Sequence, residues 1–270
     1  MKQWVTSSLV LAALLLPLAA LGQTAVDGGA SFRARAAVSA DYKITKGLHI
    51  NLEEEVRLGD GLGSLSRLQT TLGVDYKINS YLKMGASYGL LENYKATKKV
   101  FSPRHRGRFY LKGTLPLGPW RLSLKETLQL THCPGEINAT QAPRNALALK
   151  SRLQLSYKGW KPLEPYAFFE LRTGLNEAAV QATYNTATLS WSGYSFGGYG
   201  VVHNDRYRAG LGLDWKLSKH HSLSLYSLLD WNRERSIDTK LDENDKYYLS
   251  SFTLDKSFVS SVGLSYKFSF

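Results

Sequence analysis

The chain has 270 residues, and its 34 lysines and arginines against 22 aspartates and glutamates give a formal net charge of +12. The basic residues are spread evenly and no nucleic-acid-binding motif accompanies them, so no nucleic-acid partner is expected. The single cysteine, Cys133, excludes an intrachain disulfide.

The N-terminal segment has the pattern of a secretory signal peptide. Lys2 precedes an apolar stretch that ends at Leu21, and the small residue Gly22 follows. The stretch is shorter than the roughly 20 residues that a membrane-spanning helix needs. We therefore predict a signal peptide over residues 1–22, cleaved after Gly22, and one mature domain over 23–270.

Apolar and polar residues alternate with period two along the mature chain, which predicts strands with two different environments. In the first segment, for example, Arg33, Arg35 and Asp41 share one face while Val38 and Tyr42 share the other. We count eleven such segments, at residues 32–44, 48–58, 67–78, 81–91, 104–117, 120–131, 144–158, 164–173, 205–217, 222–232 and 261–270. Lengths of about 10 to 13 residues suit a tilted bilayer crossing.

Short and long connections alternate between these segments. Turns near 45–47, 79–80, 118–119 and 218–221 are tight, whereas 59–64, 92–103, 132–143, 174–204 and 233–250 are longer. This asymmetry predicts an all-β fold: an antiparallel transmembrane β-barrel of the outer membrane, with short periplasmic turns and long extracellular loops.

The expected strand number is about twelve, because bacterial single-chain barrels have an even number of strands. The eleven segments leave one strand to be found. Residues 23–30 could add it or could thread the lumen instead, and a strand could also lie within the long 174–204 loop.

Aromatic residues recur where strands approach the short turns or the C-terminus. They predict a girdle at the periplasmic interface, formed by Tyr42, Tyr76, Tyr157, Trp215 and Tyr266. The final strand alternates up to a terminal phenylalanine. Its residues Tyr266, Phe268 and Phe270 are the predicted signal for the barrel-assembly machinery.

Four segments resemble a family of Bacteroidota outer-membrane barrels that is classed as a domain of unknown function, family 2490. They are Arg104-His105-Arg106-Gly107-Arg108-Phe109-Tyr110, Arg121-Leu122-Ser123-Leu124-Lys125-Glu126, Leu149-Lys150-Ser151-Arg152-Leu153 and Glu164-Pro165-Tyr166-Ala167-Phe168-Phe169-Glu170. The resemblance extends over most of the mature chain. It implies a barrel and no established activity, so no catalytic residue follows from it.

Charged residues on the polar faces are the strongest functional feature. The predicted lumen-lining residues are Arg104, Arg106, Arg108, Lys112, Arg121, Lys150, Arg152, Glu170, Arg172, Arg206 and Arg208. Two interpretations stay open. The charges either form ion pairs that seal and rigidify a structural barrel, or they line a small solute channel that favours anions.

Catalytic residues are not expected, and neither are a metal or a cofactor. His220, His221 and Ser222 fall at a turn, and His203 ends a long loop without a nucleophile beside it. The alternatives are a lipid-modifying enzyme and a binding or secretion-accessory barrel that acts through 174–204. Outer-membrane lipid and lipopolysaccharide are the expected partners, and the oligomeric state is left open.

Overall fold

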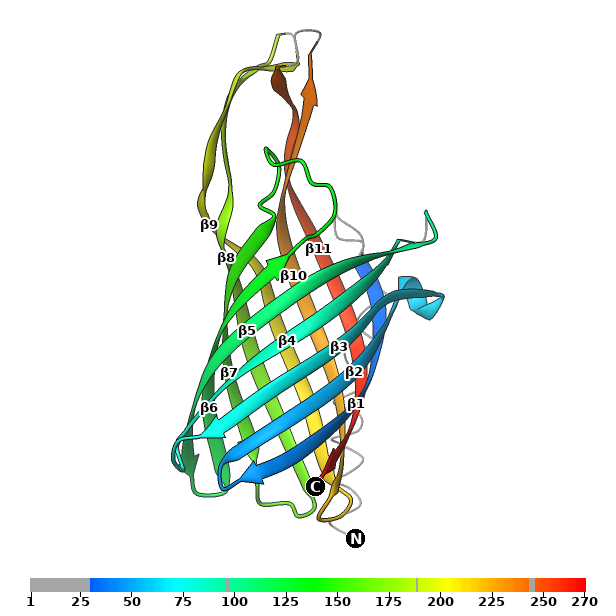
Figure 1. The fold of residues 1–270 in the computed structure, drawn as a ribbon, viewed down its shortest axis with the longest axis vertical. Helices are drawn as coiled ribbons and strands as arrows, with labels where there is room; N and C mark the ends of the chain where they lie inside the picture. The colour runs from blue at the N-terminus through cyan, green and yellow to red at the C-terminus, as the bar shows by residue number, and fades with distance from the viewer. Residues whose placement is uncertain (1–29, 96–97, 188, 243–245) are drawn as a thin grey trace.

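The computed structural model describes residues 30–95, 98–187, 189–242 and 246–270, and the predicted signal peptide lies outside this part of the chain. The described residues form eleven strands that close into one barrel (Figure 1). The strands are β1 (Ala30–Thr45), β2 (Leu48–Gly59), β3 (Ser64–Lys77), β4 (Leu82–Lys95), β5 (Val100–Leu117), β6 (Trp120–His132), β7 (Asn145–Tyr157), β8 (Leu163–Asn185), β9 (Ser190–Lys216), β10 (His221–Leu241) and β11 (Tyr247–Ser269). Among these residues, no helix has the length and apolar character needed to cross a membrane.

The barrel closes through a parallel pair. β1 lies beside β11 in the same direction, from Ala30 opposite Phe258 to Asp41 opposite Ser269, whereas the other neighbouring strands are antiparallel. The described strands are one fewer than the twelve expected. With an odd number, the first and last strands run the same way and must pair in parallel, so no further strand is needed. Residues 23–29 lie outside the described part.

The two ends of the barrel differ. At the turn end, β1, β3, β5, β7 and β9 pass into the next strand through short turns; at the hairpin end, the connections include the 12 residues 133–144 between β6 and β7. The β8–β9 and β10–β11 hairpins extend well beyond the barrel there (Figure 1). Residues 174–204 and 233–250 are predicted from the sequence to be long loops. Most of these residues instead continue the strands, as two-stranded ribbons.

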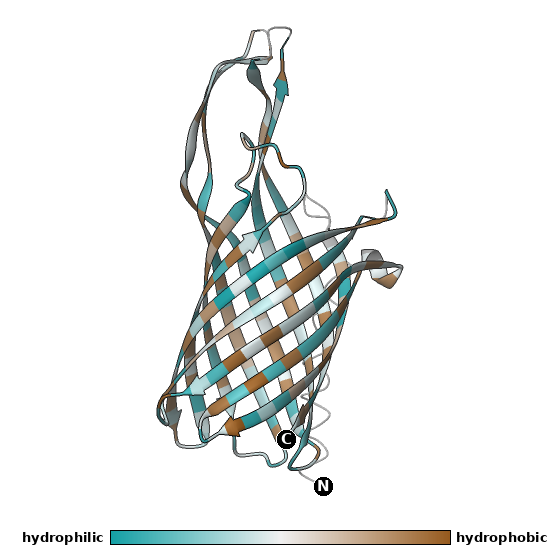
Figure 2. Ribbon diagram, viewed as in Figure 1, coloured by the Kyte–Doolittle hydropathy of each residue, from teal (hydrophilic) through white to brown (hydrophobic). Residues whose placement is uncertain are grey.

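Apolar side chains cover the outside of the barrel and charged side chains fill its inside. Val38, Leu72 and Leu124 are 60%, 54% and 50% exposed, whereas Glu170 and Arg208 are 4% and 7% exposed. Hydrophobic and hydrophilic positions alternate along the strands in Figure 2. This distribution is the inverse of a water-soluble barrel, whose apolar residues are inside.

Two outward pairs interrupt the apolar surface at mid-strand. Glu54 on β2 lies opposite Thr70 on β3, and the Thr70 hydroxyl donates to its carboxylate at 2.9 Å. Glu126 on β6 lies opposite Ser151 on β7, and the Ser151 hydroxyl donates to it at 2.6 Å. Each outward carboxylate therefore has a neutral hydrogen-bond donor on the next strand.

Inward aromatic rings lie over glycines on neighbouring strands. Tyr166 and Phe168 on β8 face Gly212 and Gly210 on β9, and the same pairing joins Tyr226 to Gly263. A Cβ atom at any of these glycines would overlap the ring. The missing side chain thus makes room for a flat ring inside a narrow barrel.

We predict that Gly212→Val lowers the free energy of unfolding by about 1–3 kcal/mol, because the new side chain must displace the Tyr166 ring. Urea titration of the refolded protein, followed by tryptophan fluorescence, measures the change. Gly107→Val is the matched control, since nothing lies within 4 Å of a Cβ at that strand glycine. Equal losses in the two variants would contradict the ring-over-glycine interpretation.

Candidate functional site

The lumen is the candidate site, because the predicted charged residues converge there. The eleven predicted lumen residues occupy the face of the sheet that carries the buried charges. They lie on β5 (Arg104, Arg106, Arg108, Lys112), β6 (Arg121), β7 (Lys150, Arg152), β8 (Glu170, Arg172) and β9 (Arg206, Arg208).

Glu170 is the centre of an ion-pair network. Its Oε2 accepts hydrogen bonds from Arg152 Nε at 2.9 Å and Nη2 at 2.6 Å. Its Oε1 accepts one from Arg206 Nη2 at 2.8 Å and lies 3.7 Å from Arg208 Nη1. A buried carboxylate is costly unless it is paired, and here three guanidinium groups surround it.

Asp230 on β10 extends the network to the seam of the barrel. It accepts hydrogen bonds from Arg208 Nε at 2.5 Å and Nη2 at 2.7 Å, and its Oδ2 lies 3.8 Å from Arg35 Nη2. Arg172 pairs separately with Asp205 at 3.0 Å. Together these contacts connect β7, β8, β9, β10 and β1 across the interior.

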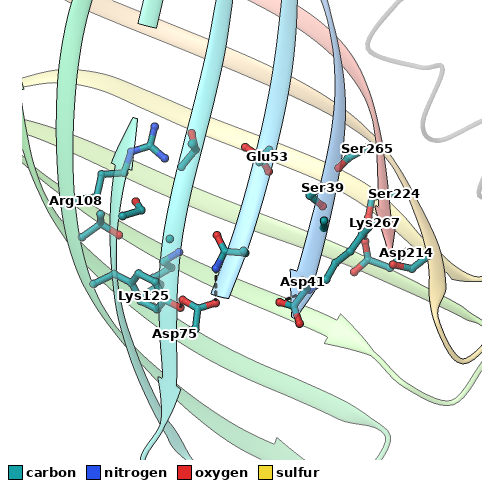
Figure 3. Close-up of a pocket in the computed structure, with 18 of the residues that line it drawn as sticks. Ser39, Asp41, Glu53, Asp75, Arg108, Lys125, Asp214, Ser224, Ser265 and Lys267 are labelled. Carbon is teal, nitrogen blue, oxygen red and sulfur yellow. Dashed lines mark hydrogen bonds and ion pairs between the residues drawn. The ribbon is translucent and has the colours of Figure 1, made fainter. Parts of the chain in front are cut away.

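A cavity of about 510 Å³ opens below this network at the turn end. Figure 3 shows Asp75, Lys125 and Arg108 among the side chains that surround it. Its charged lining comprises five acids (Asp41, Glu53, Asp75, Glu164 and Asp214) and four bases (Arg108, Lys125, Lys216 and Lys267). The cavity is therefore close to neutral, in contrast to the network above it.

Hydrogen bonds fix the acids of this cavity. Asp75 accepts from Lys83 Nζ at 2.8 Å and Asn51 Nδ2 at 3.2 Å, and it contacts the Tyr110 hydroxyl. Lys125 Nζ sits over the Tyr110 ring, 3.9 Å from its centroid. Asp75, Tyr110 and Lys125 are thus held in place on the inner wall at the turn end.

Glu164 lies near the mouth of the cavity and contacts two lysines, Lys158 and Lys216. Lys158 belongs to the turn after β7, outside the strands. Burial, together with the positive charges of Arg121 and Lys216, lowers the pKa of Lys158 to about 8.

Several inward cations have no carboxylate contact within the described part of the chain. They are Arg67, Arg104, Arg106, Arg108, Lys112, Arg121 and Lys150, from β3, β5, β6 and β7. In the network itself, five arginines (Arg35, Arg152, Arg172, Arg206 and Arg208) meet three acids (Glu170, Asp205 and Asp230). The middle of the lumen is therefore strongly positive.

All five predicted girdle residues lie near the turn end. Tyr42, Tyr76, Tyr157, Trp215 and Tyr266 are each within a few residues of the end of β1, β3, β7, β9 or β11. Trp120 and Trp160 pack against Tyr157, with ring centroids 4.8 and 5.5 Å away.

The C-terminal residues lie in the same region. The Phe268 and Phe270 ring centroids are 4.4 Å apart, and the Phe270 backbone amide donates to the backbone carbonyl oxygen of Asp41 at 2.9 Å. The predicted assembly segment therefore ends against β1, at the seam that closes the barrel.

The histidines considered as catalytic candidates make structural contacts. His220 Nδ1 lies 2.7 Å from the Ser269 carbonyl oxygen, and His221 Nδ1 lies 2.5 Å from the Tyr266 hydroxyl. His203 Nε2 lies 2.7 Å from the Arg233 carbonyl oxygen, joining the two long hairpins. In the described residues, no group of three or more His, Cys, Asp or Glu side chains is placed to hold a metal ion.

The segments beyond the hairpin end pack against one another. Asn138 in the β6–β7 loop donates to Thr239 on β10 at 2.8 Å, and the Tyr199 hydroxyl of β9 donates to the Ala139 carbonyl at 2.5 Å. Arg235 pairs with Glu177 at 3.3 Å. The two ribbons and the loop are thus one connected extension.

The sequence alone did not indicate part of the network or one outward aromatic pair. Asp230 lies at an alternate position of β10 from Tyr226 and Leu228, on the same face of the strand, so the sequence pattern predicts that it points inward. The pattern does not predict its two arginine partners. On the outside near the hairpin end, Tyr207 packs on Trp231 with centroids 5.3 Å apart.

The fold and the site define a closed β-barrel with an apolar outside and a charged, arginine-rich lumen. The family model described as protein of unknown function (DUF2490) matches residues 36–240, from β1 into β10. The chain belongs to this family, which confirms the resemblance; an origin in the Bacteroidota stays a prediction. No curated protein matches the chain.

We predict that Glu170→Gln destabilises the barrel by about 3–5 kcal/mol, because Arg152 and Arg206 lose their buried counter-charge. Urea unfolding at neutral pH measures the loss. Glu136→Gln, in the exposed β6–β7 loop, is the control and should leave stability unchanged. A loss below about 1 kcal/mol at Glu170 would contradict a stabilising network.

Proposed function

We propose that the mature chain spans the outer membrane of a Gram-negative bacterium as a non-enzymatic barrel and that its lumen is a narrow path for small anions. The observation that carries the proposal is the inverted distribution of side chains: apolar residues outside, unneutralised guanidinium groups inside. The expected signal peptide, which lies outside the described residues, fits the same location.

Lipid is the environment that suits the outer surface. A closed barrel satisfies its backbone hydrogen bonds within the sheet, as a hydrocarbon environment requires. Exposed leucines and valines at mid-strand then contact acyl chains, and the aromatic residues near both ends lie at the headgroup level. The outward Glu54 and Glu126 are hydrogen-bonded to a neighbouring hydroxyl, which lowers the cost of placing a carboxyl group there.

This placement sets the orientation and the partners. The short turns face the periplasm and the hairpin extension faces outward, where it meets lipopolysaccharide. Tyr266, Phe268 and Phe270 belong to the strand that the barrel-assembly machinery is expected to bind. No nucleic acid is a partner.

The electrostatics of the lumen favour anions over cations. Along the inner wall of β5, Arg104, Arg106 and Arg108 occupy three successive inward positions without a contacting carboxylate. Rings of positive side chains lower the barrier for anions and raise it for cations. The near-neutral cavity at the turn end gives solutes a wider approach from the periplasm.

A sealed structural barrel is the second candidate, and the Glu170 network favours it. Arg152, Arg206 and Arg208 reach towards one carboxylate from neighbouring strands and occupy the interior at that level. If these side chains fill the cross-section, the barrel passes no solute and its charges serve only to hold its walls together.

Single-channel recording separates the two candidates. In planar bilayers under a potassium chloride gradient, we predict small conductance steps and a reversal potential that shows anion preference. The double variant Arg106→Glu with Arg108→Glu should shift the reversal potential towards cation preference. Lys240→Glu, an exposed change on the β10 ribbon, is the control and should leave it in place.

Folded protein that inserts but gives no current above baseline would contradict the anion path and support the sealed barrel. Current without anion preference, unchanged in the double variant, would show that the lumen arginines do not determine selectivity.

A further inference from the structure

A patch on the inner wall collects positive charge and hydrogen-bond donors without an acid in contact. Arg106 and Arg108 on β5 lie opposite Thr131 and Gln129 on β6. On the next strand, Lys150 of β7 lies opposite Thr127. We name these six residues the oxyanion cradle: Arg106, Arg108, Thr127, Gln129, Thr131 and Lys150.

The three neutral cradle residues are buried, the three cations are partly buried, and the hydrogen bonding among them is incomplete. Gln129 is 2% exposed, and Thr127 and Thr131 are each 9% exposed. The polar contacts among them are weak: Arg106 Nε donates to Thr131 Oγ1 at 3.3 Å, and Gln129 Nε2 donates to the same oxygen at 3.2 Å. Within the described part of the chain, the donor Arg108 Nε and the acceptor Gln129 Oε1 are buried without a hydrogen-bond partner, and of the two only Arg108 Nε can donate to an anion.

The surrounding charges reinforce the positive potential. Arg106 experiences the fields of Arg57, Arg67 and Arg172 as well as that of Arg108. Lys150 experiences those of Arg206, Arg108 and Arg106, opposed by the field of Glu170. Buried like charges in this arrangement repel one another, and a bound anion would relieve the repulsion.

The acids within electrostatic reach do not complete the cradle. Glu170 is held by Arg152 and Arg206, and Glu55 is held by Arg57 at 2.5 Å. Glu53 acts on Arg108 from β2, across the interior, but makes no ion-pair contact with it among the described side chains. Among the described residues no carboxylate therefore contacts Arg106 or Lys150, and a bound anion would supply a counter-charge there.

We propose that the oxyanion cradle binds a small tetrahedral oxyanion, either free phosphate or the phosphate group of a small solute. Planar guanidinium groups donate pairs of hydrogen bonds to phosphate oxygens, and an ammonium group adds a point charge. The threonine hydroxyls and the Gln129 amide can donate to the remaining oxygens. Chloride has no oxygens with which to use these directional donors.

This inference rests on the proposed function for the delivery of the ligand through the lumen. Binding itself is measured without transport, on the mature protein folded in detergent. The probes are sodium phosphate, sodium sulfate and glycerol phosphate, each compared with sodium chloride at equal ionic strength. Isothermal titration gives the affinity, and the unfolding temperature gives an independent signal, since a ligand that binds only the folded state stabilises it.

Phosphate and sulfate are expected to bind and to raise the unfolding temperature, whereas chloride is not. Arg106→Gln and Lys150→Met should each weaken phosphate binding at least tenfold. Arg106→Lys should weaken it less, because the charge remains while the paired donors are lost. Lys240→Gln, which removes an exposed charge on the β10 ribbon, is the control and should bind phosphate like the parent chain.

A heat-dependent shift in gel mobility shows whether each variant still forms a folded barrel. If Arg106→Gln does not fold, the Arg106→Lys variant still tests the proposal. Glycerol phosphate distinguishes the two sources: binding as tight as that of phosphate indicates a phosphorylated solute, and exclusion indicates the free ion. Equal effects of phosphate and chloride, or phosphate binding unchanged in Arg106→Gln, would overturn the proposal.

The two hypotheses fail separately. Phosphate binding without current would support the oxyanion cradle and contradict the anion path. Current without a difference between phosphate and chloride binding would support the anion path and contradict the oxyanion cradle.

Discussion

The parallel pairing of β1 with β11 is the constraint on which the interior depends. It closes the sheet, so neither strand keeps a free edge, and it fixes the register at the seam, where Arg35 lies opposite Gly263. From this position Arg35 reaches Asp230 on β10, one strand further along, with 3.8 Å between Arg35 Nη2 and Asp230 Oδ2. Side chains alternate between the two faces of every strand. Once the register at the seam is fixed, the charged faces of all the strands therefore point into the barrel together.

A narrow interior then makes electrostatics decisive. Charged side chains from strands such as β7, β8 and β9 are brought to the same level, where each must be paired or carry a desolvation penalty. Around Glu170 the pairing is rich, and it favours rigidity. Along Arg104, Arg106 and Arg108 it is absent among the described residues, and this favours an anion. The same barrel thus contains a region of paired charges, which stabilises the fold, and a region of cations without a contacting acid. The second region is where a function is most readily placed.

Alternation within each strand predicted the fold class and the inward set, because period two is a local property. It did not predict how the barrel closes: the even-number rule pointed to a twelfth strand, and only the long-range parallel pairing of β1 with β11 removes that need. The β8–β9 ribbon beyond the barrel was predicted to be a loop, since Gly193, Gly197, Gly198 and Gly200 interrupt the alternation of β9. Partners such as Asp230 for Arg208, or Asp205 for Arg172, depend on which strands are neighbours, and a single sequence does not give that.

The central claim is that leucines face lipid while their neighbours in sequence face an aqueous lumen, and fluorescence quenching tests it most directly. Single cysteines at Leu124 and Leu128 on β6, and at Lys125 and Thr127 between them, are labelled after Cys133→Ser and reconstituted in lipid vesicles. The account predicts that nitroxide lipids quench the labels at 124 and 128 strongly and those at 125 and 127 weakly, while a water-soluble quencher gives the opposite order. Equal quenching at all four positions, or the reverse order, would contradict it.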